Sequence, residues 1–286
     1  MSKVAIMTDS NSGITQEEAK VLGLRVLPMP FIINGEEFFE GVGLTNDMFY
    51  EKQIADADIT TSQPSPASVT DMWDELLKEY DEVVHIPMAS GLSESCNTAK
   101  MLAEDYDGKV HVADNKRILI TQRRSVFDAV ELAKKGLSGA QIKKYLEEDS
   151  SNSGIYFMVN TMKYLKKGGR VTPAAALIGT VLGIKPVLTF QGGKIDRHAK
   201  PRGTAQAKKA IIDAVKADLE KRGLSSPDKV WLDMTYSYDL DAHLEFEKEV
   251  KAAFPGYEVS YTALSLSIAT HIGPGVIALG YTKKMD

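Results

Sequence analysis

Short apolar segments alternate with helix signals through the first half of the chain. Residues 4–7, 83–87 and 110–113 are the clearest apolar segments, and their length is typical of buried strands. Helix signals stand between them, such as the capping box that Thr15 forms with Glu18. This order favours a parallel sheet that is covered by helices on both faces.

A polar loop follows each of these apolar segments, at residues 9–10, 90–93 and 114–116. In parallel sheets, ligands bind beyond the carboxyl ends of the strands. We therefore expect the three loops to converge at one edge of the sheet and to contribute to a site there.

The pattern changes near residue 155, where strand-like segments flank a Gly192-Gly193 turn. Long helices are predicted over 204–222 and 240–253. The predicted class is α/β with two domains. Residues 1–155 form an α/β/α domain with a mainly parallel sheet, and residues 156–286 form an α+β domain with a mixed or antiparallel sheet.

Composition excludes several classes of protein. The 286 residues carry a net charge of −5, and a nucleic-acid-binding protein would need a clustered basic face. The weakly polar stretch at 172–184 is too short to span a bilayer, and four apolar residues near the N-terminus are too few for a signal peptide. A single cysteine fits a reducing compartment. We expect a cytoplasmic protein that does not span a membrane.

Nucleotide and metal motifs are absent from the sequence. It contains no G-x-x-x-x-G-K-[ST], no G-x-G-x-x-G and no HExxH, and one cysteine cannot form a thiolate cluster. We therefore expect neither a metal nor a nucleotide cofactor.

Two hydroxyl-rich segments precede helices and are candidates for anion binding. In the first, Thr61 and Ser62 lie just before Ser65 and Pro66, a typical helix start. In the second, Ser93 is followed by an acid and opens a helix. In both segments a hydroxyl either caps the helix or receives an anion, together with backbone N–H groups.

The second segment has an alternative interpretation, as the nucleophile turn of a hydrolase. Residues 91–95 resemble the nucleophile elbow G-x-S-x-G, and Asp233 and His271 follow in the order of a catalytic triad. Ser95, however, stands where the elbow has its second glycine. This alternative is a serine hydrolase of acyl esters in which Ser93 is the nucleophile.

The second half contributes two further candidates. Arg170 follows Gly168-Gly169 and precedes an uncharged stretch, where it could orient a carboxylate. His271 begins a Gly/Pro turn, and a neutral imidazole can donate one hydrogen bond and accept another. The stretch 173–188 has only Lys185 as a charged residue, and we expect it to form a buried helix and strand whose small residues leave room for a guest.

Six motifs in this order resemble the DegV family of fatty-acid-binding proteins. They are TDS at 8–10, TSQPSP at 61–66, GLS at 91–93, LKKGGRV at 165–171, IKPVL at 184–188 and HIGPG at 271–275. The resemblance covers nearly the whole chain. It implies a carrier, not an enzyme, that encloses a long-chain fatty acid in a buried tunnel between or beside its two domains.

The resemblance also implies the site and a partner. Thr61 and Ser93 would contact the carboxylate, with Arg170 and His271 supporting them. The full candidate ligand-binding set is Thr61, Ser62, Ser93, Glu94, Arg170 and His271. Bacterial members of the family present the bound fatty acid to a fatty acid kinase, which makes acyl-phosphate.

The sequence departs from the family pattern at two places. Glu94-Ser95 replaces a usual Gly-Thr, so a carboxylate ligand would be repelled unless the Glu94 side chain points to solvent. Residues 122–124 are Gln-Arg-Arg where small or aliphatic residues are more usual.

Overall fold

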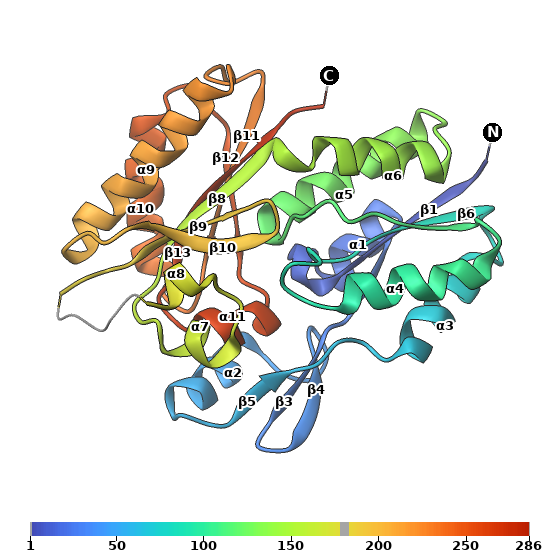
Figure 1. Cartoon of the computed structure of the whole chain (residues 1–286), viewed down its shortest axis with the longest axis horizontal. Coiled ribbons are helices and arrows are strands. Elements are labelled where there is room, and N and C mark those ends of the chain that lie inside the picture. The colour runs from blue at the N-terminus through green and yellow to red at the C-terminus, as the bar shows by residue number, and fades with distance from the viewer. Residues whose placement is uncertain (1, 178–182, 286) are drawn as a thin grey trace. The chain divides into compact units, whose positions relative to one another are not determined.

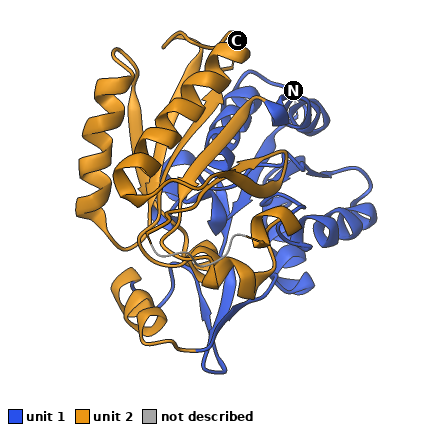
Figure 2. Cartoon of the chain, turned by 60° about the vertical axis from the view of Figure 1, so that its left-hand side comes forward, with its two compact units in different colours: residues 1–45, 58–151 blue, residues 46–57, 152–286 orange. Residues whose placement is uncertain are grey.

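The computed structural model describes residues 2–177 and 183–285 of the chain (Figure 1). These residues divide into two compact units (Figure 2). Unit 1 contains residues 1–45 and 58–151, and unit 2 contains residues 46–57 and 152–286. Residues 46–57 are thus an excursion of the chain into unit 2 from within unit 1.

Unit 1 contains a parallel sheet and a smaller antiparallel one. Its strands are β1 (Val4–Asp9), β2 (Arg25–Leu27), β3 (Pro30–Ile33), β4 (Glu36–Phe39), β5 (Ile59–Thr61), β6 (Glu82–Ile86) and β7 (Val110–Val112). Its helices are α1 (Gln16–Leu22), α3 (Pro66–Leu76), α4 (Ser95–Ala103), α5 (Leu119–Lys134) and α6 (Gly139–Glu148), with short 3-10 turns at Ser10–Ser12, Glu104–Tyr106 and Asp149–Ser151.

The main sheet of unit 1 has the order β2-β1-β6-β7, and every pair in it is parallel. Helices α3 and α4 pack on one face, where Trp73 and Cys96 are buried against Met7 and Val83. Helices α5 and α6 also contact the sheet and lie against each other. Strands β4-β3-β5 form a separate antiparallel sheet.

Unit 2 is built on one mixed sheet. Its strands are β8 (Ser153–Met158), β9 (Val187–Gln191), β10 (Lys194–Ala199), β11 (Val230–Tyr236), β12 (Val259–Ala263) and β13 (Ile277–Lys283). Its helices are α2 (Asn46–Ile54), α7 (Lys163–Gly168), α8 (Pro173–Ala176), α9 (Gly203–Lys221), α10 (Leu240–Ala253) and α11 (Leu266–Ile272).

The sheet of unit 2 has the order β10-β9-β8-β13-β11-β12, and all pairs except β11–β12 are antiparallel. Helices α9 and α10 contribute Val215 and Phe246 to a core that also contains Met234 and Leu279 from the strands. The predicted fold class is confirmed: a parallel sheet in the first half of the chain and a mixed sheet in the second.

Local sequence explains where several helices begin. The Thr15 hydroxyl accepts the N–H of Glu18, whose carboxylate accepts the N–H of Thr15, so the predicted capping box starts α1. Ser65 caps α3 through the N–H of Ser68. Asp239 caps α10 in the same way, and this helix covers the predicted range 240–253.

The stretch after Arg170 differs from the prediction. Only one turn of helix, α8, forms within the described part of 173–188, and residues 178–182 lie outside the described residues. Ala175 is buried, but Leu177 is 81% exposed, so the expected burial is wrong at that residue. A single turn has only one side to bury: Thr172 caps the turn and donates to Asp196 of β10, Ala175 fills the buried side, and Leu177 follows the last residue of the turn.

Candidate ligand-binding site

The loop between β6 and α4 carries Ser93 and Glu94. Ser93 is half-buried, and its Oγ accepts the N–H of Ser95 at 3.2 Å, so the hydroxyl does serve the start of α4. A hydroxyl that accepts one hydrogen bond can still donate its own hydrogen to an anion. Glu94 is exposed and accepts a hydrogen bond from Asn97 at 2.8 Å. The Glu94 side chain thus points to solvent, which is the condition under which it would not repel a carboxylate ligand.

The segment with Thr61 and Ser62 leaves β5, where Thr61 pairs with Phe31 of β3. Thr61 is half-buried and Ser62 is exposed. The next residue, Gln63, accepts a hydrogen bond from Thr98 of α4 at 3.1 Å. This contact joins the segment after β5 to α4, the helix that Ser93 precedes.

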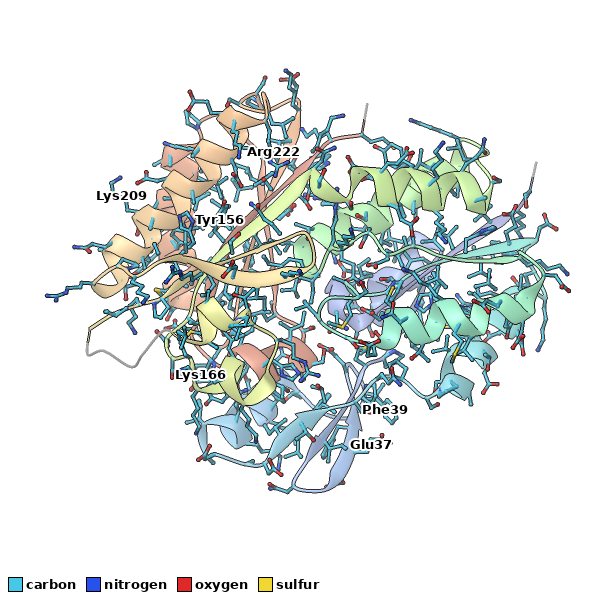
Figure 3. The ribbon with its side chains drawn as sticks, in the orientation of Figure 1. Glu37, Phe39, Tyr156, Lys166, Lys209 and Arg222 are labelled. Atoms are coloured by element: carbon cyan, nitrogen blue, oxygen red, sulfur yellow. The ribbon has the colours of Figure 1, made fainter. Side chains whose placement is uncertain are left out.

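A surface pocket of about 340 Å³ lies beside the first segment. Ser62, Pro64 and Pro66 line it together with Glu37 and Phe39, which Figure 3 labels on the hairpin of β4. Unit 1 therefore presents both hydroxyl and apolar surface next to a predicted contact residue.

The three polar loops of the parallel sheet converge, as predicted. Asp9, at the end of β1, accepts the N–H of Met88 at 2.7 Å, and Asp114, after β7, accepts the Ser90 hydroxyl at 2.6 Å. Burial raises the pKa of the Asp9 carboxyl to about 6, although hydrogen bonds from Met88, Gln122 and the Asn11 segment oppose the rise.

The unusual Gln-Arg segment at 122–124 has a structural role in unit 1. Gln122 is fully buried on α5 and donates to Asp9, to the Thr8 hydroxyl and to the Ile86 carbonyl, at 3.1–3.2 Å. Arg123 pairs with Glu18 of α1 at 2.6 Å. Gln122 thus fastens α5 to the carboxyl edge of the sheet, and Arg123 fastens it to α1.

In unit 2 the structure brings Arg170 and His271 together. Burial and, second, the positive charge of Arg170 lower the pKa of His271 to about 4. The imidazole is therefore neutral at pH 7 and can act as a donor or an acceptor. Arg170 itself is exposed, and its guanidinium donates to the Gly168 carbonyl.

The two glycine-containing motifs of unit 2 pack against each other. A methyl group on Gly168 would overlap the His271 ring, and one on Gly273 would overlap the Tyr164 ring. Gly273 also has φ +86°, a conformation that side chains with a Cβ rarely adopt. The end of α7 and the turn after α11 thus approach each other closely only because both positions are glycine.

The excursion 46–57 supports this part of unit 2. Buried Gln53 of α2 donates to the Ala269 carbonyl of α11 at 2.8 Å, and Asp56 pairs with Lys163 of α7 at 2.5 Å. Sequence reasoning missed this segment, because its polar and apolar residues show no helical period.

The hydrolase alternative gains no support from these features. A nucleophile elbow holds its serine on a sharp, strained turn, whereas Ser93 is not among the residues with positive φ. Asp233, the second member of the supposed triad, lies within β11 and accepts a hydrogen bond from Ser260 of β12 at 2.5 Å.

Within residues 2–177 and 183–285, no group of three or more His, Cys, Asp or Glu side chains could hold a metal ion. In the same described ranges no helix combines the length and the apolar character needed to cross a membrane.

Comparisons with known proteins agree over nearly the full length. A solved fatty-acid-binding DegV family protein of Thermus thermophilus is 30% identical, covers 99% of this chain and 100% of its own, and has a TM-score of 0.90. A stearic-acid-binding protein of Eubacterium ventriosum is 28% identical with 99% of both chains covered and a TM-score of 0.88. DegV of Bacillus subtilis, a fatty-acid-binding protein, is 27% identical over 99% of this chain and 100% of its own, with a TM-score of 0.86.

Sequence comparison gives the same family. A DegV domain-containing protein of Staphylococcus aureus is 30% identical over 287 residues, which covers 98% of this chain and 97% of that protein. The model for uncharacterised proteins of the DegV family matches residues 3–284. The chain therefore belongs to the DegV family.

Proposed function

We propose that this protein is a carrier that binds one long-chain fatty acid and has no catalytic activity of its own. The hydroxyls of Thr61 and Ser93 donate to the carboxylate, and Arg170 and His271 complete its hydrogen-bonding network. Ser62 and Glu94 flank the contact residues. The acyl chain is buried in a tunnel of the soluble fold.

The observation that carries the proposal is the full-length likeness to three solved proteins named for binding a fatty acid or stearic acid. The chemistry of the residues agrees with it. Ser93 keeps a hydrogen to donate while it accepts from Ser95, and His271 is neutral at pH 7 and can also donate.

The acyl chain and the carboxylate contribute differently to the free energy of binding. Each buried methylene contributes about 0.8 kcal/mol, so the acyl chain supplies most of the affinity. A hydrogen bond to a charged group adds about 1.5–3 kcal/mol, which is enough to fix the orientation of the carboxylate and to distinguish acids from alcohols.

Native mass spectrometry tests the binding step. Protein purified from a bacterial host is expected to carry a fatty acid in near one-to-one amount, and lipid extraction with mass analysis would identify the chain. Delipidated protein should take up palmitate or oleate but much less of the matching alcohol. Protein that remains free of ligand after incubation with both acids would refute the proposal.

We further propose that the protein works in the cytoplasm and presents its ligand to a fatty acid kinase for acyl-phosphate formation. The single cysteine suits a reducing compartment. The test combines the loaded protein, a bacterial fatty acid kinase and ATP, and follows acyl-phosphate as its hydroxamate. Product should require both proteins. Equal product from free fatty acid and kinase alone would remove the presenting role and leave the binding role standing.

A further inference from the structure

The loop that carries Ser93 is held by a carboxylate on a neighbouring loop of unit 1. Asp114 follows β7, and its two oxygens accept both groups of Ser90: the hydroxyl at 2.6 Å and the backbone N–H at 3.3 Å. Lys100 of α4 lies 3.4 Å from the same carboxylate. Burial opposes ionisation of Asp114, but the bonds from Ser90 and the charge of Lys100 hold its pKa below the usual range.

A short turn connects Ser90 to Ser93. The N–H of Leu92 donates to the Ala89 carbonyl at 3.0 Å, so residues 89–92 form a closed turn with Ser93 at its end. The Ser93 hydroxyl then accepts from Ser95 and has one hydrogen left to direct. Fixing Ser90 therefore restrains the turn that Ser93 follows.

The loop that carries Asp114 is itself rigid. Lys116 has φ +53° and Leu119, which is buried, has φ +51°; such strain persists only where the surroundings enforce it. Arg117 between them is 1% exposed and anchors the loop, because its guanidinium donates to Asp149 at 2.6 Å and to Ser125 at 2.8 Å.

Arg117 also makes the second tie between the two loops, because its carbonyl accepts the N–H of Ala89 at 3.0 Å. The loop with Ser93 is thus anchored through Ala89 and Ser90 to a segment that has little freedom to move.

We propose that Asp114 is a positioning residue for ligand recognition: it holds Ser90 so that the Ser93 hydroxyl points at the ligand carboxylate. This inference rests on the proposed function. Asp114 does not contact the ligand in this scheme, and it acts through the geometry of the turn 89–92.

Unit 1 offers a matched control for this residue. Glu82, at the start of β6, accepts the N–H of Gly139 and the ring N–H of His111, each at 2.8 Å. Its side chain is 18% exposed, against 11% for Asp114, and it ties the same sheet to its surroundings through these two hydrogen bonds and a third from the Ser2 side chain. The difference is the position, since Glu82 lies at the opposite end of β6 from the loop with Ser93.

The experiment uses palmitate labelled with ¹³C at the carboxyl carbon, because its chemical shift reports the hydrogen bonds of the head group. Asp114→Ala should weaken palmitate binding about tenfold and move the bound carboxyl resonance, since the donating direction of Ser93 is lost. Asp114→Asn should restore most of the affinity, because its amide can accept from the Ser90 N–H and donate to the Ser90 hydroxyl.

The remaining variants separate positioning from stability. Glu82→Ala should lower the midpoint of thermal unfolding as much as Asp114→Ala while leaving the affinity and the carboxyl resonance unchanged. Ser90→Ala, which keeps the backbone bond, should move the resonance by a smaller amount.

Two results would overturn the inference. One is an Asp114→Ala protein that binds palmitate with the affinity and carboxyl resonance of the parent; the other is an equal loss of affinity in Asp114→Ala and Glu82→Ala. A parent protein that takes up no palmitate at all would refute the proposed function and this inference with it, and so is distinguishable from both.

Discussion

Asp9 predicts an unusual dependence of stability on pH. Its carboxyl is 2% exposed, and burial raises its pKa from 3.8 to about 6. Because the folded protein binds this proton more tightly than the unfolded chain, ionisation of Asp9 opposes folding. The stability that protonated Asp9 contributes is fully present below pH 3.8 and is lost as the pH rises through 6.

The magnitude follows from the two pKa values. A tenfold change in an ionisation constant corresponds to about 1.4 kcal/mol, so the rise from 3.8 to about 6 costs about 3 kcal/mol once Asp9 is fully ionised. Linkage places about 2 kcal/mol of this cost between pH 4.5 and 7.5. The remainder falls at more acidic pH, where other carboxyl groups also titrate.

This cost of ionising Asp9 is measured by urea unfolding of the parent and of Asp9→Asn at several pH values between 4.5 and 7.5. The amide cannot ionise, so the difference in unfolding free energy between the two proteins should shift by about 2 kcal/mol in favour of the variant as the pH rises. The amide of the variant also presents an N–H₂ group to a network of donors, which lowers the variant's stability by an amount that does not depend on pH. A difference that stays constant across the range would refute the reasoning, because it would mean that Asp9 is ionised throughout.

Three further predictions concern the proposed site. Ser93→Ala and Thr61→Ala should each weaken fatty-acid binding by about 1–3 kcal/mol without unfolding the protein, as measured by palmitate titration and circular dichroism. Arg170→Ala should weaken binding more than His271→Ala, since His271 is neutral at pH 7, and unchanged affinity in both would show that neither supports the head group. Gly168→Ala should lower thermal stability and weaken binding because its methyl displaces the His271 ring; a variant that melts and binds as the parent does would contradict this packing.

The sequence predicted best those features that local chemistry determines. Asp239 caps α10, and the helix covers its predicted range because cap and periodic apolar residues agree. The convergence of Asp9, Ser90 and Asp114 followed from a general property of parallel sheets, in which the loops after the strands meet at one edge.

Features that depend on distant contacts were missed. Nothing local in 46–57 indicates that Gln53 will bond to Ala269, which lies 216 residues further along the chain. Leu119 gives no signal that it adopts φ +51°, because the conformation is imposed by the loop around Arg117 and not by a leucine's own preference. Leu177 was expected to be buried with its apolar neighbours, but a single turn of helix has only one side to pack.

Gly168 and Gly273 of unit 2 belong to motifs that predict a ligand site, and both are also required for close packing. Gly168 belongs to the segment that delivers Arg170, and its missing side chain is the space that the His271 ring occupies. Gly273 follows His271, and its missing side chain is the space for the Tyr164 ring. Each segment therefore needs the glycine of the other for close packing, and a side chain at either glycine would separate Arg170 from His271. Since burial and, second, the charge of Arg170 keep His271 neutral at pH 7, this close packing also sets the protonation state of the imidazole.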